Sequence, residues 1–328
     1  MLGSKKETGA ASPGLVLAVD LGGTHLRGAT VDRNGNVHHR FKQPTPQAEK
    51  ADDIVQAIIA AARESGTTAI SALSVAVPGT INFQKGAVVS TPNIPCLDGF
   101  PLAIVLKREL ECPVILENDA NAAAVGEMWQ GAGRGHGTIV CLTLGTGVGG
   151  GIILDGKVWR GADGSAAEIG HISVNPFGGV KCPCGSHDCL EVYASATAIV
   201  RQTRERLPHY PGSRLHRDEE LTSEKVYRAG VEGDELALEV FKVMGVYLGA
   251  GVASLINVIN PEIVIIGGGA ANGWELFEKH MRHEVTDRDF PLPAAHVKIV
   301  RAECGDDAGL LGAAHLAFTT EQGDNLLI

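Results

Sequence analysis

One histidine and three cysteines lie within nineteen residues of this chain of 328 residues. They are His171, Cys182, Cys184 and Cys189. Three thiolates and one imidazole are a common ligand set for a closed, tetrahedral zinc site. Such residues can also lie close in sequence by chance, because free Cys often acts as a small buried hydrophobe. The spacing favours zinc, and His187 is a fifth candidate ligand that leaves the choice of imidazole open.

Two acidic residues flank this cluster, Glu168 on its N-terminal side and Glu191 on its C-terminal side. A metal ion bound within the cluster would hold both carboxylates at defined positions. Ionised carboxylates accept hydrogen bonds from hydroxyl groups. The arrangement therefore suits binding of a polyhydroxylated small molecule better than it suits a bare structural finger.

The other four cysteines stand singly among apolar residues, and we expect them to be core thiols. They are Cys96, Cys112, Cys141 and Cys304. An odd total of seven Cys, in a chain without a secretory signal, argues against a disulfide framework.

The composition predicts a globular protein of two domains. Hydrophobic residues make up 44% of the chain, which is enough to bury a large core. The net charge of −10 opposes a broad surface for nucleic acid or anionic membranes. No apolar run reaches the length of a membrane span. Residues 1–13 are polar, which predicts a disordered lead-in and not a signal peptide. We expect a protein of the reducing cytoplasm.

A glycine-rich turn between two strand-like segments occurs twice, about 123 residues apart. The turns are Gly22, Gly23 and Thr24, and Gly145, Thr146 and Gly147. Successive backbone N–H groups without a Cβ in the way form a concavity for an anion, and Thr adds a hydroxyl donor. Neither turn opens a helix, as a dinucleotide fingerprint requires, and neither precedes the Gly-Lys-Ser/Thr of a Walker loop. The alternative is an ordinary β-turn, but two copies favour phosphate binding.

Two acids stand where strands end. Asp20 precedes the first turn and could hold Mg²⁺ through water, or it could simply be a strand-end acid. Asp119 follows a buried strand and begins a helix, so it is either an N-cap or a base that accepts a hydroxyl proton during phosphoryl transfer. Its neighbour Asn118 can both donate and accept hydrogen bonds, which suits sugar hydroxyls.

Periodicity and turn signals place strands and helices around these residues. The predicted strands are 15–20, 25–31, 37–41, 70–77, 114–116, 138–144, 152–154, 157–159, 263–266 and 297–300. The predicted helices are 52–65, 102–110, one from about Ala120, 194–206, 223–229, 234–257 and 307–318. The repeated strand–turn–strand pattern predicts two related domains.

Taken together, these segments resemble the ROK family of sugar kinases and sugar-responsive repressors, from about Leu15 to Leu316. The matching segments are Asp20–Thr24, Pro78–Gly79, Thr91–Asn93, Glu117–Asn121, Leu144–Gly150, Glu168–His171, Cys182–Gly185, Cys189–Glu191, Pro261–Glu262 and Gly267–Gly269. Each segment is short, but their number and order are specific.

The resemblance implies an α/β protein with the actin-like ATPase (ribonuclease H-like) fold, in which two α/β domains have a cleft between them. The smaller domain would comprise residues 14–118 and a C-terminal helix at 305–320. The larger would comprise residues 119–304, with a zinc-binding loop at 171–189.

The resemblance also implies roles for single residues, with Asp119 as the catalytic base. The residues implied to bind the sugar are Gly79, Asn93, Asn118, Asp119, Glu168, His171 and Glu191. Those implied to bind ATP with Mg²⁺ are Asp20, Gly22, Gly23, Thr24, Gly145, Thr146, Gly147, Gly267, Gly268 and Gly269. His171, Cys182, Cys184 and Cys189 would hold a structural Zn²⁺, and the second ring nitrogen of His171 would face the sugar.

The chain departs from the family pattern in three places. Ten residues separate His171 from Cys182, one more than the family pattern has, and Asp188 precedes the third cysteine where Gly is usual. The segment after Asn93 lacks the expected Trp. These departures reshape the metal loop and the rim around the sugar.

The implied activity is an ATP-dependent glucokinase that phosphorylates the 6-hydroxyl of glucose. The alternatives are a kinase for N-acetylmannosamine, N-acetylglucosamine, mannose or fructose, and a non-catalytic sugar-binding regulator. Repressors of this family carry a helix-turn-helix segment before the first Gly-Gly-Thr, and the fourteen residues before Leu15 are too few for one. We therefore expect a kinase that forms a homodimer or a dimer of dimers.

Overall fold

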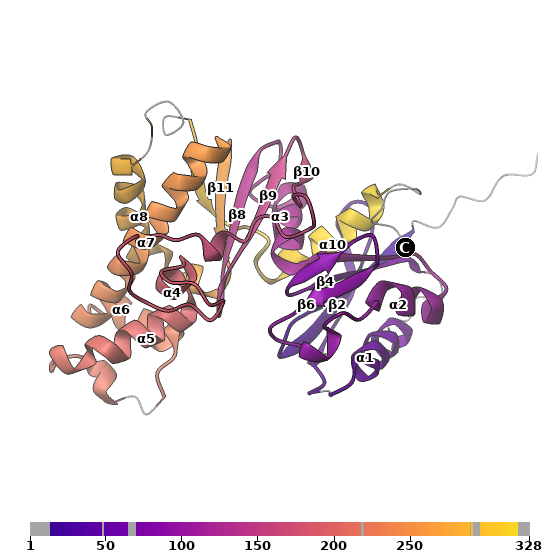
Figure 1. Ribbon diagram of the computed structural model, residues 1–328, viewed down its shortest axis with the longest axis horizontal. Helices are drawn as coiled ribbons and strands as arrows, with labels where there is room; N and C mark the ends of the chain where they lie inside the picture. The colour runs from indigo at the N-terminus through magenta and orange to yellow at the C-terminus, as the bar shows by residue number, and fades with distance from the viewer. Residues whose placement is uncertain are drawn as a thin grey trace, which may run out of the picture. The chain divides into compact units, whose positions relative to one another are not determined.

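The computed structural model describes residues 14–47, 49–64, 70–217, 220–288, 290 and 296–320, which form two compact units (Figure 1). The first unit is Met1–Asn118 with Ala313–Ile328, and the second is Asp119–Gly312. The lead-in expected at residues 1–13 lies outside the described residues. Residues 305–312 group with the second unit, whereas the sequence assigned them to the first.

The first unit is built on a five-stranded sheet of order β3-β2-β1-β4-β7. Its strands are β1 (Leu15–Leu21), β2 (His25–Val31), β3 (Val37–Pro44), β4 (Ile70–Val77) and β7 (Val114–Asn118). The first three form an antiparallel meander, and β4 and β7 extend the sheet in parallel from β1. Helices α1 (Ala51–Glu64) and α2 (Leu102–Leu110) pack together against Leu and Val side chains of β1 and β4.

The second unit repeats this strand order as β10-β9-β8-β11-β12. The strands are β8 (Ile139–Leu144), β9 (Val148–Leu154), β10 (Lys157–Val158), β11 (Ile263–Gly267) and β12 (Lys298–Arg301). The same mixture of pairing recurs, with β8–β9–β10 antiparallel and β11 and β12 parallel to β8. The predicted internal repeat is thus a repeat of sheet topology, and each Gly/Thr turn joins the first two strands of its sheet.

Helices cover both faces of the second sheet. Figure 1 shows α3 on one side, with α7 and α8 on the other. The helices of this unit are α3 (Asp119–Gln130), α4 (Glu191–Ala194), α5 (Ala196–Arg206), α6 (Ser223–Val231), α7 (Glu235–Ile259), α8 (Trp274–Arg288) and α10 (Ala308–Thr319), which ends in the first unit.

Most predicted elements are confirmed within a few residues. The strands at 25–31 and 70–77 and the helix at 102–110 have the predicted bounds. The predicted helix at 194–206 is two helices, because the backbone of Ser195 is extended and its hydroxyl caps α5 by accepting the N–H of Ala198. Helix α8 and the short hairpin of β5 (Thr80–Asn82) and β6 (Ala87–Ser90) were not predicted.

Helix α7 forms the centre of the second unit. By length and composition alone it could cross a membrane, with a mean hydropathy of 1.6 over its most apolar window. The expectation that no apolar run reaches the length of a membrane span was therefore wrong for this helix, although a long apolar helix was predicted at 234–257. However, 67% of that window is buried inside the protein. Phe241, Met244 and Leu248 pack with side chains of β8 and β11. Packing in a globular core therefore accounts for its hydrophobicity.

Close backbone contact between α3 and α10 explains why residues 305–312 belong to the second unit. Gly126 of α3 lies so near Ala308 of α10 that a Cβ at residue 126 would overlap the Ala308 carbonyl oxygen. Buried Glu127 adds hydrogen bonds, because its carboxylate accepts the backbone N–H groups of Glu303 at 3.1 Å and Cys304 at 2.8 Å.

We predict that Gly126→Ala destabilises the protein by about 1–3 kcal/mol, because a backbone carbonyl must move to admit the methyl group. Gly137→Ala is the control, since its Cβ would lie 3.7 Å from the Glu262 carboxylate, an ordinary contact. Denaturant unfolding of both variants checks the prediction. Equal stability of the two variants would show that α3 and α10 can separate at little cost.

Candidate functional site

The first Gly/Thr turn is held by backbone hydrogen bonds at the end of β1. The Gly22 N–H donates to the His25 carbonyl at 2.9 Å, and the Thr45 hydroxyl donates to the Gly22 carbonyl at 2.5 Å. Asn93 lies over the turn, since a Cβ on Gly23 would be 2.8 Å from the Asn93 Cβ. The structure thus brings Asn93 to the predicted phosphate turn of the first unit.

Asp20 is buried beside this turn and pairs with Arg27 across the β1–β2 ladder. The sequence did not reveal this ion pair, because it depends on strand register. A carboxylate paired in this way can still bind Mg²⁺ indirectly, by accepting hydrogen bonds from the water molecules that the ion retains.

Asn118 and Gly79 are also brought together. The Asn118 side-chain amide donates to the Gly79 carbonyl at 3.1 Å. Gly79 has φ of 116°, and a Cβ there would overlap the backbone of Ser90. Gly79 is therefore required by the chain turn, and its carbonyl orients the Asn118 amide.

Asp119 is the first residue of α3, directly after β7. Its Oδ1 accepts the Ala120 N–H at 2.8 Å. This position at the helix start is compatible with both alternatives from the sequence, a helix cap and a functional acid. The positive end of the helix dipole favours a negative charge there. The Asp119 side chain is half-buried at this helix start.

The second Gly/Thr turn joins β8 to β9 and is in contact with Glu191. The Gly145 N–H donates to the Gly147 carbonyl at 2.9 Å, which closes the turn. The Glu191 Oε2 accepts the Val148 N–H at 3.1 Å. A Cβ on Gly147 would overlap the same carboxylate oxygen. Glycine at 147 is therefore what allows the Glu191 carboxylate to lie against the turn.

Glu168 and His171 reach the same strand end. Glu168 precedes a single 3-10 turn, Ile169–His171, which His171 ends, and the His171 N–H donates to the Glu168 carbonyl at 3.0 Å. The backbone of Gly170 lies against the Val148 carbonyl. Val148 is therefore in contact with both the Glu168–His171 turn and Glu191, so these three of the four predicted sugar ligands in this unit belong to segments that meet at the start of β9.

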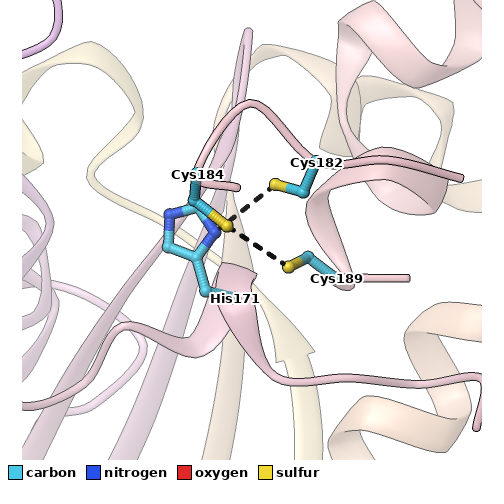
Figure 2. A group of neighbouring side chains, drawn as sticks. All are labelled: His171, Cys182, Cys184 and Cys189. Atoms are coloured by element: carbon cyan, nitrogen blue, oxygen red, sulfur yellow. Dashed lines mark hydrogen bonds between the residues drawn. The ribbon is translucent and has the colours of Figure 1, made fainter. Parts of the chain in front are cut away.

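The predicted metal ligands converge (Figure 2). The ligand atoms of His171, Cys182, Cys184 and Cys189 all lie within 4.8 Å of one another. The Cys184 and Cys189 sulfurs are 3.7 Å apart, and the His171 Nδ1 is 3.8 Å from the Cys182 sulfur. Tetrahedral zinc with ordinary bond lengths requires sulfur–sulfur distances of about 3.8 Å and sulfur–nitrogen distances of about 3.6 Å.

The donor set and its spacing therefore fit Zn²⁺, with Nδ1 as the ligand nitrogen of His171. Burial raises the pKa of the Cys189 thiol to about 12, whereas a backbone hydrogen bond from Ser186 lowers the pKa of Cys184. His187 is not part of the group. All seven cysteines are free, and Cys112 and Cys141 are buried, while Cys96 and Cys304 are partly exposed.

A cavity of about 810 Å³ opens beside the second turn. It lies wholly within the second unit. Its lining includes Gly145 and Thr146 of the turn and Gly269 from the predicted triple glycine; Gly267 and Gly268 are not among the lining residues. Motif reasoning missed most of the wall, because its side chains come from helices, a 3-10 turn and a strand that are far apart in the sequence. These residues include Ser223, Glu224, Tyr227, Arg228, Asn272, Glu275 and Arg301.

Known proteins are similar to this chain in both sequence and fold. The model of the ROK family matches residues 16–320. A glucokinase of Thermotoga maritima is 37% identical over 92% of this chain and 96% of its own length. A glucokinase of Halalkalibacterium halodurans is 37% identical over 93% of this chain and 95% of its own. The crystal structure of a ROK family glucokinase from Streptomyces griseus, in complex with glucose and AMPPNP, superposes with a TM-score of 0.80. Its identity is 35%, over 94% of this chain and 100% of that one.

We predict that Gly147→Ala destabilises the protein by about 1–3 kcal/mol, because the displaced Glu191 carboxylate leaves the buried Val148 N–H without its acceptor. Gly145→Ala is the matched control, since nothing lies within 4 Å of its added Cβ. Denaturant unfolding compares the two variants. A Gly147→Ala variant as stable as the control would mean that Glu191 is not fixed by the turn.

Proposed function

This chain belongs to the ROK family, and we propose that it is a glucokinase, which transfers the γ-phosphoryl group of ATP to the 6-hydroxyl of glucose. The observation that carries the proposal is the cavity beside the second Gly/Thr turn. Its volume suits a nucleoside, and the turn at its edge offers backbone donors for phosphate.

In this proposal the adenosine occupies the cavity and its phosphates reach Gly145, Thr146 and Gly147. Gly269 borders the nucleoside, since it lies on the cavity wall. The turn of Gly22, Gly23 and Thr24, with Asp20, is the corresponding phosphate and Mg²⁺ element of the first unit. Mg²⁺, when bound, neutralises charge that develops on the phosphate oxygens.

Asp119 is the proposed base. Its carboxylate accepts the proton of the sugar hydroxyl as that oxygen forms a bond to the γ-phosphorus and the bond from phosphorus to the ADP oxygen breaks. A negative charge at this position interacts favourably with the N-terminus of α3.

Sugar hydroxyls are proposed to be bound by carboxylates, amides and one imidazole. In the second unit these groups are Glu168, Glu191 and the Nε2 of His171, whose Nδ1 faces the thiols. In the first unit they are Asn93 and Asn118, with Gly79 orienting the Asn118 amide. Asn93, Glu168 and His171 are exposed and Asn118 and Glu191 are half-buried, so these groups are open to a ligand. A site built to hydrogen-bond the hydroxyls of its substrate discriminates strongly against a ligand that lacks the matching hydroxyl.

We propose that the Cys₃His cluster holds a structural Zn²⁺. The metal would fix His171 and the segment that leads from Cys189 to Glu191. Because Glu191 contacts the second Gly/Thr turn, the metal loop would stabilise a ligand of the sugar and the phosphate turn together.

We further propose a cytoplasmic enzyme that acts on a small sugar and forms a homodimer or a dimer of dimers, with no nucleic-acid or membrane partner. The alternative is a sugar-binding regulator, which would have no use for a nucleotide in the cavity beside the second Gly/Thr turn.

A coupled ADP-release assay with ATP and Mg²⁺ tests the acceptor directly. We expect the highest kcat/KM for glucose in a panel with mannose, fructose, N-acetylglucosamine and N-acetylmannosamine. A higher kcat/KM for an N-acetylhexosamine would support the assignment as a kinase but would show that glucose is not its preferred substrate. Sugar binding by calorimetry without turnover of any sugar would favour the regulator.

We predict that Asp119→Asn lowers kcat by roughly 10²–10⁴-fold while glucose binding is retained, because the amide keeps the shape of the side chain and cannot accept the proton. Rapid-quench kinetics and calorimetry measure the two quantities separately. Near-normal turnover in this variant would remove Asp119 from the role of base.

We predict that Cys184→Ser lowers the zinc content and weakens glucose binding, because one thiolate of the ligand set is lost. Atomic emission spectroscopy gives the zinc content and calorimetry the affinity. Cys112→Ser is the control, because this buried thiol lies in the core of the first unit. A metal-depleted protein that binds glucose as tightly as the wild type would show that zinc does not organise the site.

A further inference from the structure

Asp188 is buried inside the metal loop in a conformation that few residues adopt. Its φ is 57°, in the left-handed region where Asn and Asp are the commonest residues after Gly. Only 1% of its surface is exposed, and it directly precedes the ligand Cys189. A buried acid at this position calls for a physical reason, since Gly would adopt the same backbone conformation without a charge.

Both the backbone and the side chain of Asp188 bind the segment that precedes the cysteines. Its N–H donates to the Val180 carbonyl at 2.8 Å, and its Oδ1 accepts the Val180 N–H at 3.0 Å. Its carbonyl accepts the Val174 N–H at 3.0 Å. One residue thus closes the loop between the ligands His171 and Cys182.

Tyr193 connects this closure to the body of the second unit. The Tyr193 hydroxyl donates to the Asp188 Oδ1. The Tyr193 ring stacks on Tyr247 of α7, with ring centroids 3.7 Å apart and planes 13° from parallel. The Tyr193 carbonyl accepts a hydrogen bond from the Gln202 side chain of α5 at 3.0 Å. Tyr193 is therefore fixed by both helices and can serve as an anchor.

Asp188 and Tyr193 lie on either side of Cys189 and Glu191 in the sequence. Cys189 follows Asp188, and Glu191 lies between Asp188 and Tyr193 on α4. The hydrogen bond from Tyr193 to Asp188 thus spans the segment that carries a zinc ligand and a sugar ligand. If that hydrogen bond were lost, this segment could move without breaking a bond to zinc itself.

We propose that Asp188 is a positioning residue, which through Tyr193 and Val180 sets the geometry of Cys189 at the metal and of Glu191 at the sugar. This inference rests on the proposed function, because it assigns Asp188 a part in the same site. Residues that orient metal ligands typically change metal affinity or activity by 10–100-fold when they are replaced.

The test compares three substitutions in the full-length protein. Asp188→Gly keeps the left-handed backbone and removes the carboxylate. Asp188→Asn keeps the oxygen that accepts both hydrogen bonds, and its amide nitrogen takes the place of Oδ2, which is buried without a partner among the described residues. The control is Asp155→Gly, which replaces another Asp of positive φ, 50°, at an exposed turn of the same unit.

Two readouts separate positioning from general stability. The first is the rate of zinc release to a chromophoric chelator, which we expect Asp188→Gly to raise by roughly 10–100-fold. The second is the kinetics with glucose, where we expect a raised KM and an unchanged kcat, because Asp119 belongs to a different element. Asp188→Asn should restore both values towards those of the wild type, and Asp155→Gly should match the wild type.

Zinc release and KM in Asp188→Gly equal to those of Asp155→Gly would overturn the inference, as would a wild-type protein that binds no zinc. A lower unfolding midpoint of Asp188→Gly with both readouts unchanged would also contradict it. Failure of the proposed function is recognised separately, as a zinc-loaded wild type that phosphorylates no sugar. In that case the zinc-release comparison still decides whether Asp188 positions the metal loop.

Discussion

The contact between the Glu191 carboxylate and the start of β9 is the constraint on which the second unit's site depends. It joins three features that are separate in sequence, namely the metal loop, the Gly/Thr turn and the Glu168–His171 turn. The contact exists because residue 147 has no side chain and because the Val148 N–H needs an acceptor once it is buried. A change in the metal loop therefore reaches the phosphate turn through one carboxylate and one backbone amide.

The two sheets have the same topology but differ in the side chains that lie beside their Gly/Thr turns. Both have an antiparallel meander extended by two parallel strands, and both place a Gly/Thr turn after the first strand. In the first unit Asp20 and Arg27 form an ion pair beside that turn. In the second, Glu191 reaches the turn from the first residue of α4, directly after the metal loop. The repeat supplies one Gly/Thr turn in each unit, and a different acid lies beside each turn.

Much of the fold, and the convergence of the four candidate metal ligands, was predictable from the sequence because both depend on local signals. Strand ends followed by Gly-Gly-Thr, Asp119 at a helix start and four closely spaced metal ligands are each visible in a short segment. Helix α8 was missed because its apolar residues are few, with Phe277, Met281 and Val285 as its buried ones. The lining of the cavity was missed because Tyr227, Glu275 and Arg301 come from three distant elements.

The role of Asp188, which stands where the family pattern has Gly, can be inferred only from the contacts that its side chain makes in the structure. From the sequence, Asp in place of Gly is a tolerated substitute at a left-handed turn. The structure gives the carboxylate two hydrogen bonds and gives its donor Tyr193 a stacking partner on α7. Burial of a charge is unfavourable unless hydrogen bonds compensate. Asp188 in place of Gly therefore replaces a flexible turn residue with one that fixes the loop 171–189 through its side chain. These hydrogen bonds restrict the conformations of the segment between His171 and Cys189, which contains the four candidate metal ligands.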